Sequence, residues 1–438
     1  MVNSLKNYLG ISILLMLACG ILLNANEKQR TDVGYDLKIT GDLRVGYVDY
    51  DYNNPLPSSA LINRGHTDSH GYYIVPKLSI LTPTYRNFSL KTTVAGATDF
   101  GINDSDYESR NFVFDSTDKK SFVLLQELFI SYTNNSHNFT IGRQELVTPL
   151  IEADDYYMYS NSFEVVNYIN SAIDNFQFHL GYFHKMAGTW DSGADGTEFH
   201  SMSDASGVDS RDKTNANDSG VIYGAVQYKN EAHNFKIWDY YATDLYNIFL
   251  TQYGFENSIN NFSYNLGAQI TNYKEVGKLA KNNYTNIDYT IYSVKFDGKF
   301  DNGFDFATGV TKYSDGEGQG ATLGVWGGFP SYTYGFTYSY FDAGSLQNSL
   351  IYKAQIGYDL GKIGLNDTWI GYRYTDYNLD SKYSKSASLQ AQNDMQLHGV
   401  RIKYSTDIGV YFTGTYEYRT LDKEKDSSAL RLIGGYKF

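Results

Sequence analysis

Apolar and polar residues alternate along many separate segments of this chain. In residues 37–47, one row holds Leu37, Ile39, Gly41, Leu43, Val45 and Tyr47, and the other begins with Lys38, Thr40, Asp42 and Arg44. A strand points successive side chains to opposite faces, so each segment requires an apolar medium on one face and water on the other. The same alternation recurs in residues 290–297, 350–359 and 410–419. The pattern predicts an all-β fold whose apolar medium is a protein core or lipid.

The connections between these segments fall into two length classes. Short ones span 82–87, 133–137, 170–175, 230–235, 301–304 and 405–409, and long ones span 53–68, 101–120, 188–218, 274–286 and 378–393. The two classes broadly alternate along the chain. Outer-membrane barrels have short periplasmic turns and long extracellular loops, whereas a soluble β-sandwich shows no such asymmetry. The connections therefore favour a transmembrane antiparallel β-barrel.

Composition agrees with a β-rich membrane protein. The chain has 42 Tyr, 25 Phe and 40 Gly but only 6 Pro, which is a strand-forming palette. The mean hydropathy of -0.42 resembles that of soluble proteins, but alternating strands never produce a uniformly apolar window. The net charge of -13 makes nucleic acid an unfavourable partner.

The N-terminus has the pattern of a secretory signal peptide. Lys6 precedes an apolar run from Tyr8 to Leu23, and small residues follow around Ala25. We expect cleavage after Ala25, which leaves residues 26–438 as a single barrel domain. A lipidation site at Cys19 is the alternative. Because Cys19 is the only cysteine, the mature chain would carry no disulfide.

The C-terminal sequence "LRLIGGYKF" predicts a final strand. Leu430, Leu432, Gly434, Tyr436 and Phe438 form one row, and Arg431, Ile433, Gly435 and Lys437 form the other. We interpret Tyr436 and Phe438 as the signal that the barrel assembly machinery recognises. Any last strand of a β protein could end in this way, but the signal peptide and the loop asymmetry favour the barrel.

The number of strands is less certain from the alternation alone. About 20 segments are periodic, several of them weakly, in 234–256 and 320–341, and the even-number rule restricts the choice to 16, 18 or 20 strands. Pro76 lies inside the strand-like stretch "YYIVPKLSIL". Because proline lacks a ladder donor, we expect a bulge there.

The stretch "GRQELVTPLIEADDYYMYSNSFEVV", residues 142–166, differs from the other connections. It resembles the OprD-like family of outer-membrane porins, with looser similarity at 238–255, 358–365 and 371–377. The matching positions are Gly142, Arg143, Gln144, Thr148, Pro149, Leu150, Asp155, Met158, Asn161, Phe163 and Glu164. The resemblance implies 18 strands and a loop that folds inward to narrow the pore. It also implies that an arginine in this loop contacts the carboxylates of small substrates.

This sequence departs from the family pattern at two positions of that loop. Asp154 stands where the family has Asn, and Tyr157 stands where it has Arg. Both changes make the narrow point more negative, and carboxylates in a constriction favour cations. We therefore predict a constriction with a mild cation preference, although its acids could instead be solvated and without effect. Its predicted residues are Arg143, Glu152, Asp154, Asp155 and Tyr157.

Other chemistries have weak support in the sequence. The Asp49 and Asp51, Asp104 and Asp106, and Asp191 and Asp195 pairs lack the full spacing of a calcium loop. The chain has 8 histidines but no G-x-S-x-G or H-E-x-x-H signature. We expect neither an enzyme nor a bound cofactor or metal.

The leading hypothesis is a passive porin of the bacterial outer membrane. Its partners would be small hydrophilic solutes and ions, outer-membrane lipid and the assembly machinery, and it could act as a monomer or a homotrimer. The alternative is a non-conducting barrel that acts as a surface adhesin or structural protein through the 188–218 loop.

Overall fold

The computed structural model describes most of the chain beyond residue 36. The described residues are 37–51, 69–103, 121–151, 159–188, 197–202, 220–282, 287–316, 326, 328–336, 346–380, 394–421 and 426–438. The chain divides into Met1–Asp36 and Leu37–Phe438. The first unit, with the predicted signal peptide, lies outside the described residues, so that prediction stays a prediction.

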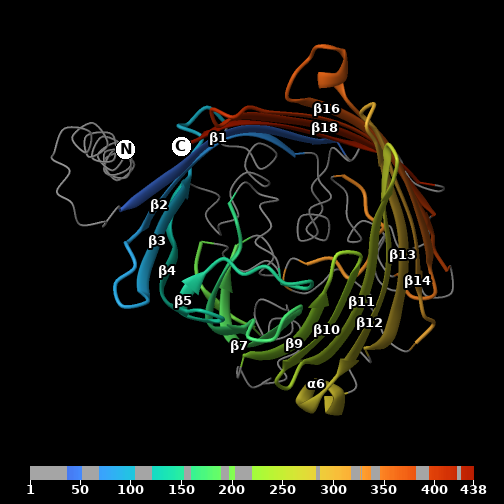
Figure 1. The fold of residues 1–438 in the computed structure, drawn as a ribbon. Coiled ribbons are helices and arrows are strands. Elements are labelled where there is room, and N and C mark those ends of the chain that lie inside the picture. The colour runs from blue at the N-terminus through green and yellow to red at the C-terminus, as the bar shows by residue number, and fades with distance from the viewer. Residues whose placement is uncertain are drawn as a thin grey trace. The chain divides into compact units, whose positions relative to one another are not determined.

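The second unit is one antiparallel sheet that closes on itself (Figure 1). Its strands are β1 (Lys38–Asp51), β2 (Ser69–Leu81), β3 (Phe88–Ala97), β4 (Phe122–Asn134), β5 (His137–Gln144), β6 (Ser162–Asn170), β7 (Phe176–Ala187), β8 (His200–Ser201), β9 (Val221–Lys229), β10 (His233–Ala242), β11 (Tyr246–Ile259), β12 (Phe262–Glu275), β13 (Asp288–Phe300), β14 (Phe304–Tyr313), β15 (Leu350–Asp359), β16 (Thr368–Asn378), β17 (Met395–Ser405), β18 (Val410–Leu421) and β19 (Ser427–Lys437).

Closure and strand number follow from the pairing. Apart from β8, each strand pairs with the next strand in sequence, and β1 also pairs with β19 from Asp42 with Lys437 to Asp51 with Ser428. β8 contacts only the end of β7, while β7 pairs directly with β9. Without β8 the closed barrel has 18 strands, which confirms the predicted number.

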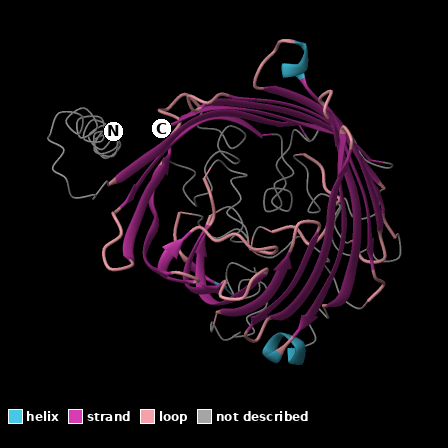
Figure 2. Cartoon of the chain, in the orientation of Figure 1, coloured by secondary structure: helices cyan, strands magenta, loops and turns pink. Residues whose placement is uncertain are grey.

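Among the described residues, two short helices lie in connections between strands (Figure 2). They are α6 (Gly277–Asn282) and a single 3-10 turn, η2 (Leu360–Ile363). Among the described residues, no helix has the length and apolar character needed to span a membrane.

The alternating rows occupy the two faces of the barrel wall as predicted. On β1, Leu43 and Val45 are 44% and 48% exposed on the outside, whereas Val48 and Tyr50 are buried on the inside. On β18, Tyr416 lies outside, and Glu417 is fully buried inside. The outer rows of the strands are apolar because they face lipid, and the charged rows face the interior.

Connection lengths divide the two ends of the barrel. β4 and β5 are joined by residues 135–136, and β11 and β12 by residues 260–261, all at the end with short turns. The opposite end carries the long connections, with two short exceptions, residues 243–245 between β10 and β11 and residues 422–426 between β18 and β19. The weakly periodic stretch 234–256 overlaps two strands, β10 and β11.

The second weak stretch, 320–341, is described only in part. Its described residues, 326 and 328–336, contain no strand and belong to the connection between β14 and β15. Residues 328–336 contact the inner wall of the barrel, as described below.

The expected bulge at Pro76 is also wrong. β2 pairs with β1 in continuous register from Ser69 to Leu81. On the other side, the β2 ladder with β3 stops at Lys77, and an isolated bridge between Ile74 and Thr98 continues the same register. Proline is tolerated because its missing N–H interrupts only this second ladder.

Candidate pore constriction

Two long connections meet inside the barrel. Residues 145–161 join β5 to β6, and residues 314–349 join β14 to β15. Leu150, Ile151 and Trp326 are fully buried, and Ile151 forms a parallel bridge with Trp326. The Gly328 N–H donates to the Leu150 carbonyl at 3.2 Å, and a Cβ at Gly328 would lie 2.4 Å from Leu150 Cα. Only glycine permits this close approach of the two backbones.

These connections pack against one side of the inner wall. The Trp326 ring meets the Phe183 ring edge-on at 5.4 Å, and the Tyr240 ring lies 6.1 Å away. The Tyr240 hydroxyl donates to Thr148 Oγ1 at 2.8 Å. Phe183 and Tyr240 come from β7 and β10, so a buried aromatic core fills this side of the barrel interior.

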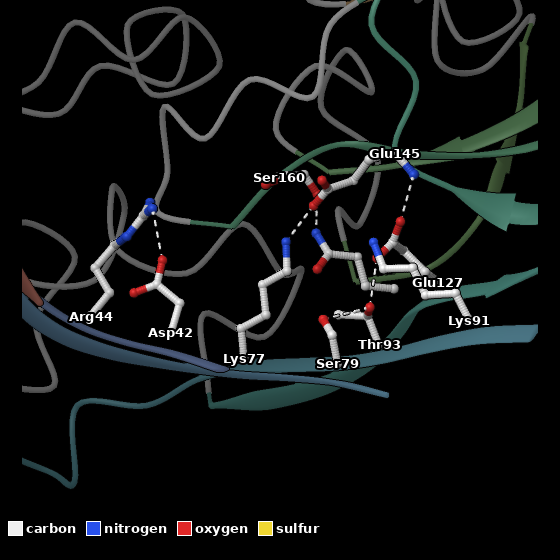
Figure 3. Close-up of polar contacts among 10 residues, drawn as sticks. Asp42, Arg44, Lys77, Ser79, Lys91, Thr93, Glu127, Glu145 and Ser160 are labelled. Atoms are coloured by element: carbon white, nitrogen blue, oxygen red, sulfur yellow. Dashed lines mark hydrogen bonds and ion pairs between the residues drawn. The ribbon is translucent and has the colours of Figure 1, made fainter. Parts of the chain in front are cut away.

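Polar side chains on β2, β3 and β4 hold residues 145 and 160 from the opposite direction (Figure 3). Lys77 forms an ion pair with Glu145. Glu127 accepts a hydrogen bond from the Glu145 N–H at 3.3 Å and forms an ion pair with Lys91 at 2.7 Å. The two ends of the first connection are thus anchored together, because Gln126 also donates to the Ser160 carbonyl at 2.7 Å.

Residues 328–336, here called the wall segment, run along the polar inner wall. Thr271 on β12 donates to the Pro330 carbonyl at 3.3 Å. Ser293 on β13 accepts from the Tyr332 N–H at 2.9 Å. Short polar side chains on successive strands therefore hold the backbone of the segment in place.

The wall segment continues across β14 to β18. Thr333 donates to Thr311 Oγ1 on β14 at 2.7 Å. Beyond it, Arg373 on β16 and Arg401 on β17 donate to backbone carbonyls of residues 334–336. The wall segment thus lies across the inner faces of these strands and reduces the open cross-section of the barrel on its polar side.

Basic side chains around these segments have acidic or aromatic partners. Arg44 pairs with Asp42 at 3.4 Å, and Lys295 pairs with Asp297. Lys353 lies 5.5 Å from the centre of the Tyr334 ring. Burial, with a smaller contribution from the Asp297 carboxylate, raises the pKa of Tyr332 to about 12, so its hydroxyl stays neutral. Arg44 and Lys295 are thus paired with carboxylates, whereas Lys353 contacts an aromatic ring.

The predicted constriction residues fall in two places. Glu152, Asp154, Asp155 and Tyr157 lie within 152–158, outside the residues that the structure describes. Arg143 belongs to the outward row of β5, which also contains the 47% exposed Ile141.

Arg143 contacts neighbouring outward side chains. It binds Glu164 at 2.9 Å, and its guanidinium lies 4.1 Å from the Phe199 ring. These contacts tie β5 to β6 at the outer end of the barrel and do not involve the wall segment. Arg143 lies two residues after Ile141, so the two-residue period of a strand could have placed its side chain on the outer face.

Sequence reasoning missed the second inturned connection and its arginines. Arg373 and Arg401 belong to alternating strands, so the pattern does place them on inward rows. Nothing in the pattern reveals that loop carbonyls cover them, because the contacts join residues far apart in the sequence.

No family model and no curated protein sequence matches the chain. Solved structures do match. OccK9 (OpdG) of Pseudomonas aeruginosa superposes with a TM-score of 0.72 at 11% identity, covering 92% of this chain and 98% of that one. A BenF-like porin from Pseudomonas fluorescens Pf-5 has a TM-score of 0.71 at 12% identity, with coverage of 92% and 98%. Acinetobacter baumannii OccAB3 has a TM-score of 0.71 at 13% identity, with coverage of 92% and 99%.

The fold is therefore that of an outer-membrane β-barrel of the OprD-like porin type. This confirms the predicted resemblance at the level of the fold, over nearly the whole barrel. A closed barrel with apolar outer rows belongs in the bacterial outer membrane.

Proposed function

We propose that the protein is a passive diffusion channel for small hydrophilic solutes and ions. The observation that carries the proposal is the closed 18-stranded barrel with a polar inner wall, narrowed by two inturned connections. One similar solved structure, from Pseudomonas fluorescens Pf-5, is named a BenF-like porin, which agrees with this proposal. The arrangement requires no cofactor, and we assign no catalytic role to it.

We propose a mild cation preference for this channel. The basic residues Arg44, Lys77, Lys91 and Lys295 each pair with a carboxylate. Arg373 and Arg401 bind backbone carbonyls instead, so we propose that negative charge at the narrow point decides which ions pass. Glu152, Asp154 and Asp155 are the proposed source of that negative charge.

Purified protein in a planar bilayer tests the channel. Stepwise conductance is expected, with a reversal potential in a potassium chloride gradient that favours potassium. A persistently silent membrane, with correctly folded protein, would favour the non-conducting adhesin or structural barrel. The solute class can be probed with small acids, sugars and amines, and vanillate belongs in that panel because OpdK was crystallised with it.

The proposed partners besides solutes and ions are lipid, the barrel assembly machinery and further copies of the chain. Lipid contact and recognition by the barrel assembly machinery are proposed from the apolar outer rows and the C-terminal strand. The choice between monomer and homotrimer stays open and is settled by the mass of the detergent-solubilised protein.

A further inference from the structure

Two arginines of the inner wall bind the same three residues of the wall segment. Arg373 donates from Nη1 to the carbonyl oxygens of Tyr334 and Gly335, at 3.1 and 2.9 Å. Arg401 donates from Nη2 to the carbonyl oxygen of Phe336, at 2.9 Å. Three consecutive carbonyls therefore face a pair of guanidinium groups.

Other wall side chains fix the orientation of both guanidinium groups. Gln355 Oε1 accepts from Nε and Nη2 of Arg373, at 2.9 and 2.8 Å. Thr415 Oγ1 accepts from Nε of Arg401, at 2.9 Å. The donors that face the wall segment are thus held in one direction by side chains outside the segment.

Phe336 completes the contact through its ring and its backbone. The guanidinium carbons of Arg373 and Arg401 lie 4.1 and 4.2 Å from the ring centre, so both cations stack on the same ring. The Phe336 N–H donates to the fully buried Glu417 carboxylate. The carbonyl oxygens and the ring of residues 334–336 therefore contact two cations, and the Phe336 N–H contacts one anion.

An anionic solute would use the same guanidinium donors. A carboxylate or phosphate adds Coulomb attraction to these hydrogen bonds and can accept two parallel N–H bonds from one guanidinium, which a single carbonyl oxygen cannot do. A solute shifts an equilibrium between two states only when it binds one of them better. The state in which carbonyls occupy both arginines offers fewer donors than the state in which they have left.

We infer that residues 334–336 are an internal ligand of the Arg373 and Arg401 pair, which an anionic solute displaces. Displacement exposes two cations and widens the passage beside β16 and β17. The channel then has a narrow state and a wider, more anion-permeable state. This inference rests on the proposed channel function and adds regulation to it.

A disulfide between the wall segment and β14 tests the displacement directly. The hydroxyl oxygens of Thr311 and Thr333 are 2.7 Å apart, so Thr311→Cys with Thr333→Cys brings two thiols close together. In wild-type bilayer recordings, inorganic phosphate should increase the time spent in the larger-conductance state. The oxidised variant should lose this response, and dithiothreitol should restore it. Each single-cysteine variant serves as a control.

Removal of the Phe336 ring tests the same contact without a cross-link. Phe336→Ala should favour the wider state without phosphate, by roughly tenfold, because two cation–π contacts are lost. Phe336→Tyr keeps the ring and should behave like the wild type. Unheated electrophoretic mobility verifies that each variant has folded.

The outcomes separate the inference from the proposed function. Wild-type protein that conducts, while the oxidised and Phe336→Ala variants show unchanged conductance and reversal potential, would overturn the internal ligand. A silent wild type would overturn the channel instead. The inference is still tested in that case, because phosphate should slow disulfide formation in the double-cysteine variant, and an unchanged rate would reject it.

Discussion

Leu43 and Arg44 are neighbours in the chain and face different media. The Leu43 side chain lies on the apolar outer row, and Arg44 faces inward, where it contacts Asp42 and the Tyr411 hydroxyl at 3.0 Å. The two positions differ by one residue because a strand has a side-chain period of two. The chemical consequence of a substitution therefore depends on the face and not on the neighbourhood in sequence.

We expect Leu43→Arg to impair assembly and Arg44→Leu to be tolerated. A charge on the lipid face costs about 2–4 kcal/mol near the bilayer midplane, whereas a lumen substitution adds no such cost. The measurement is the fraction of folded protein in the outer-membrane preparation. Equal loss for both variants would contradict the assignment of the two faces.

The second residue-level prediction concerns the acids of the first inturned connection. Asp154→Asn combined with Asp155→Asn should lower the permeability of cations relative to anions, because two negative charges leave the proposed narrow point. The reversal potential in a salt gradient measures this ratio. Asp49→Asn with Asp51→Asn, at the outer end of β1, is the matched control. A reversal potential equal to that of the wild type would reject the filter role of Asp154 and Asp155.

At the level of elements, the first inturned connection depends on β4. Glu127 is 2% exposed and binds Lys91, Thr93 and the backbone of Glu145. A buried carboxylate with this many partners is stable only while each partner remains. The position of the connection is therefore fixed by a strand that precedes it in the sequence.

We expect Glu127→Ala to increase amide hydrogen exchange in residues 145–151 and to lower the stability of the barrel. Removal of one partner of a buried ion pair costs about 3–5 kcal/mol. Glu127→Gln retains hydrogen-bonding atoms and should cost less. Urea unfolding in lipid vesicles gives the stability, and amide hydrogen exchange gives the local loosening. Identical exchange of residues 145–151 in both variants and the wild type would show that Glu127 does not anchor them.

At the level of the whole molecule, the barrel is completed where its ends meet. Gly41 and Phe438 exchange two backbone hydrogen bonds at 3.0 and 3.1 Å. A Cβ built on Gly41 would lie 2.3 Å from the Phe438 ring, so the ring covers this glycine on the outer surface. Tyr436 and Phe438 are both 46% exposed toward lipid.

Gly41→Val should weaken barrel closure because its side chain would occupy the position of the Phe438 ring. We expect a smaller fraction of protein to resist unfolding in unheated detergent electrophoresis. Gly434→Val is the matched control, since a Cβ there meets its nearest atom at 3.8 Å. Similar losses in the two variants would mean that the contact between the Phe438 ring and Gly41 makes no specific contribution to barrel closure.

The two-residue period in the sequence was sufficient for the barrel, its faces and its short turns. The period is informative because each side chain of a barrel strand faces either lipid or the interior, and its polarity matches the medium that it faces. The OprD-like motif added the strand number. The period was misleading at residues 328–336, which form no strand, and the bulge expected at Pro76 is absent because only one ladder lacks a donor.

Only the tertiary structure decided how the interior is filled. The contacts of Trp326 with Ile151, of Glu145 with Lys77, and of Arg373 with Tyr334 and Gly335 join residues far apart in the chain. Alternation specifies that a side chain points inward but not which backbone it meets there. That choice depends on barrel closure, which brings distant strands and connections into one enclosed space.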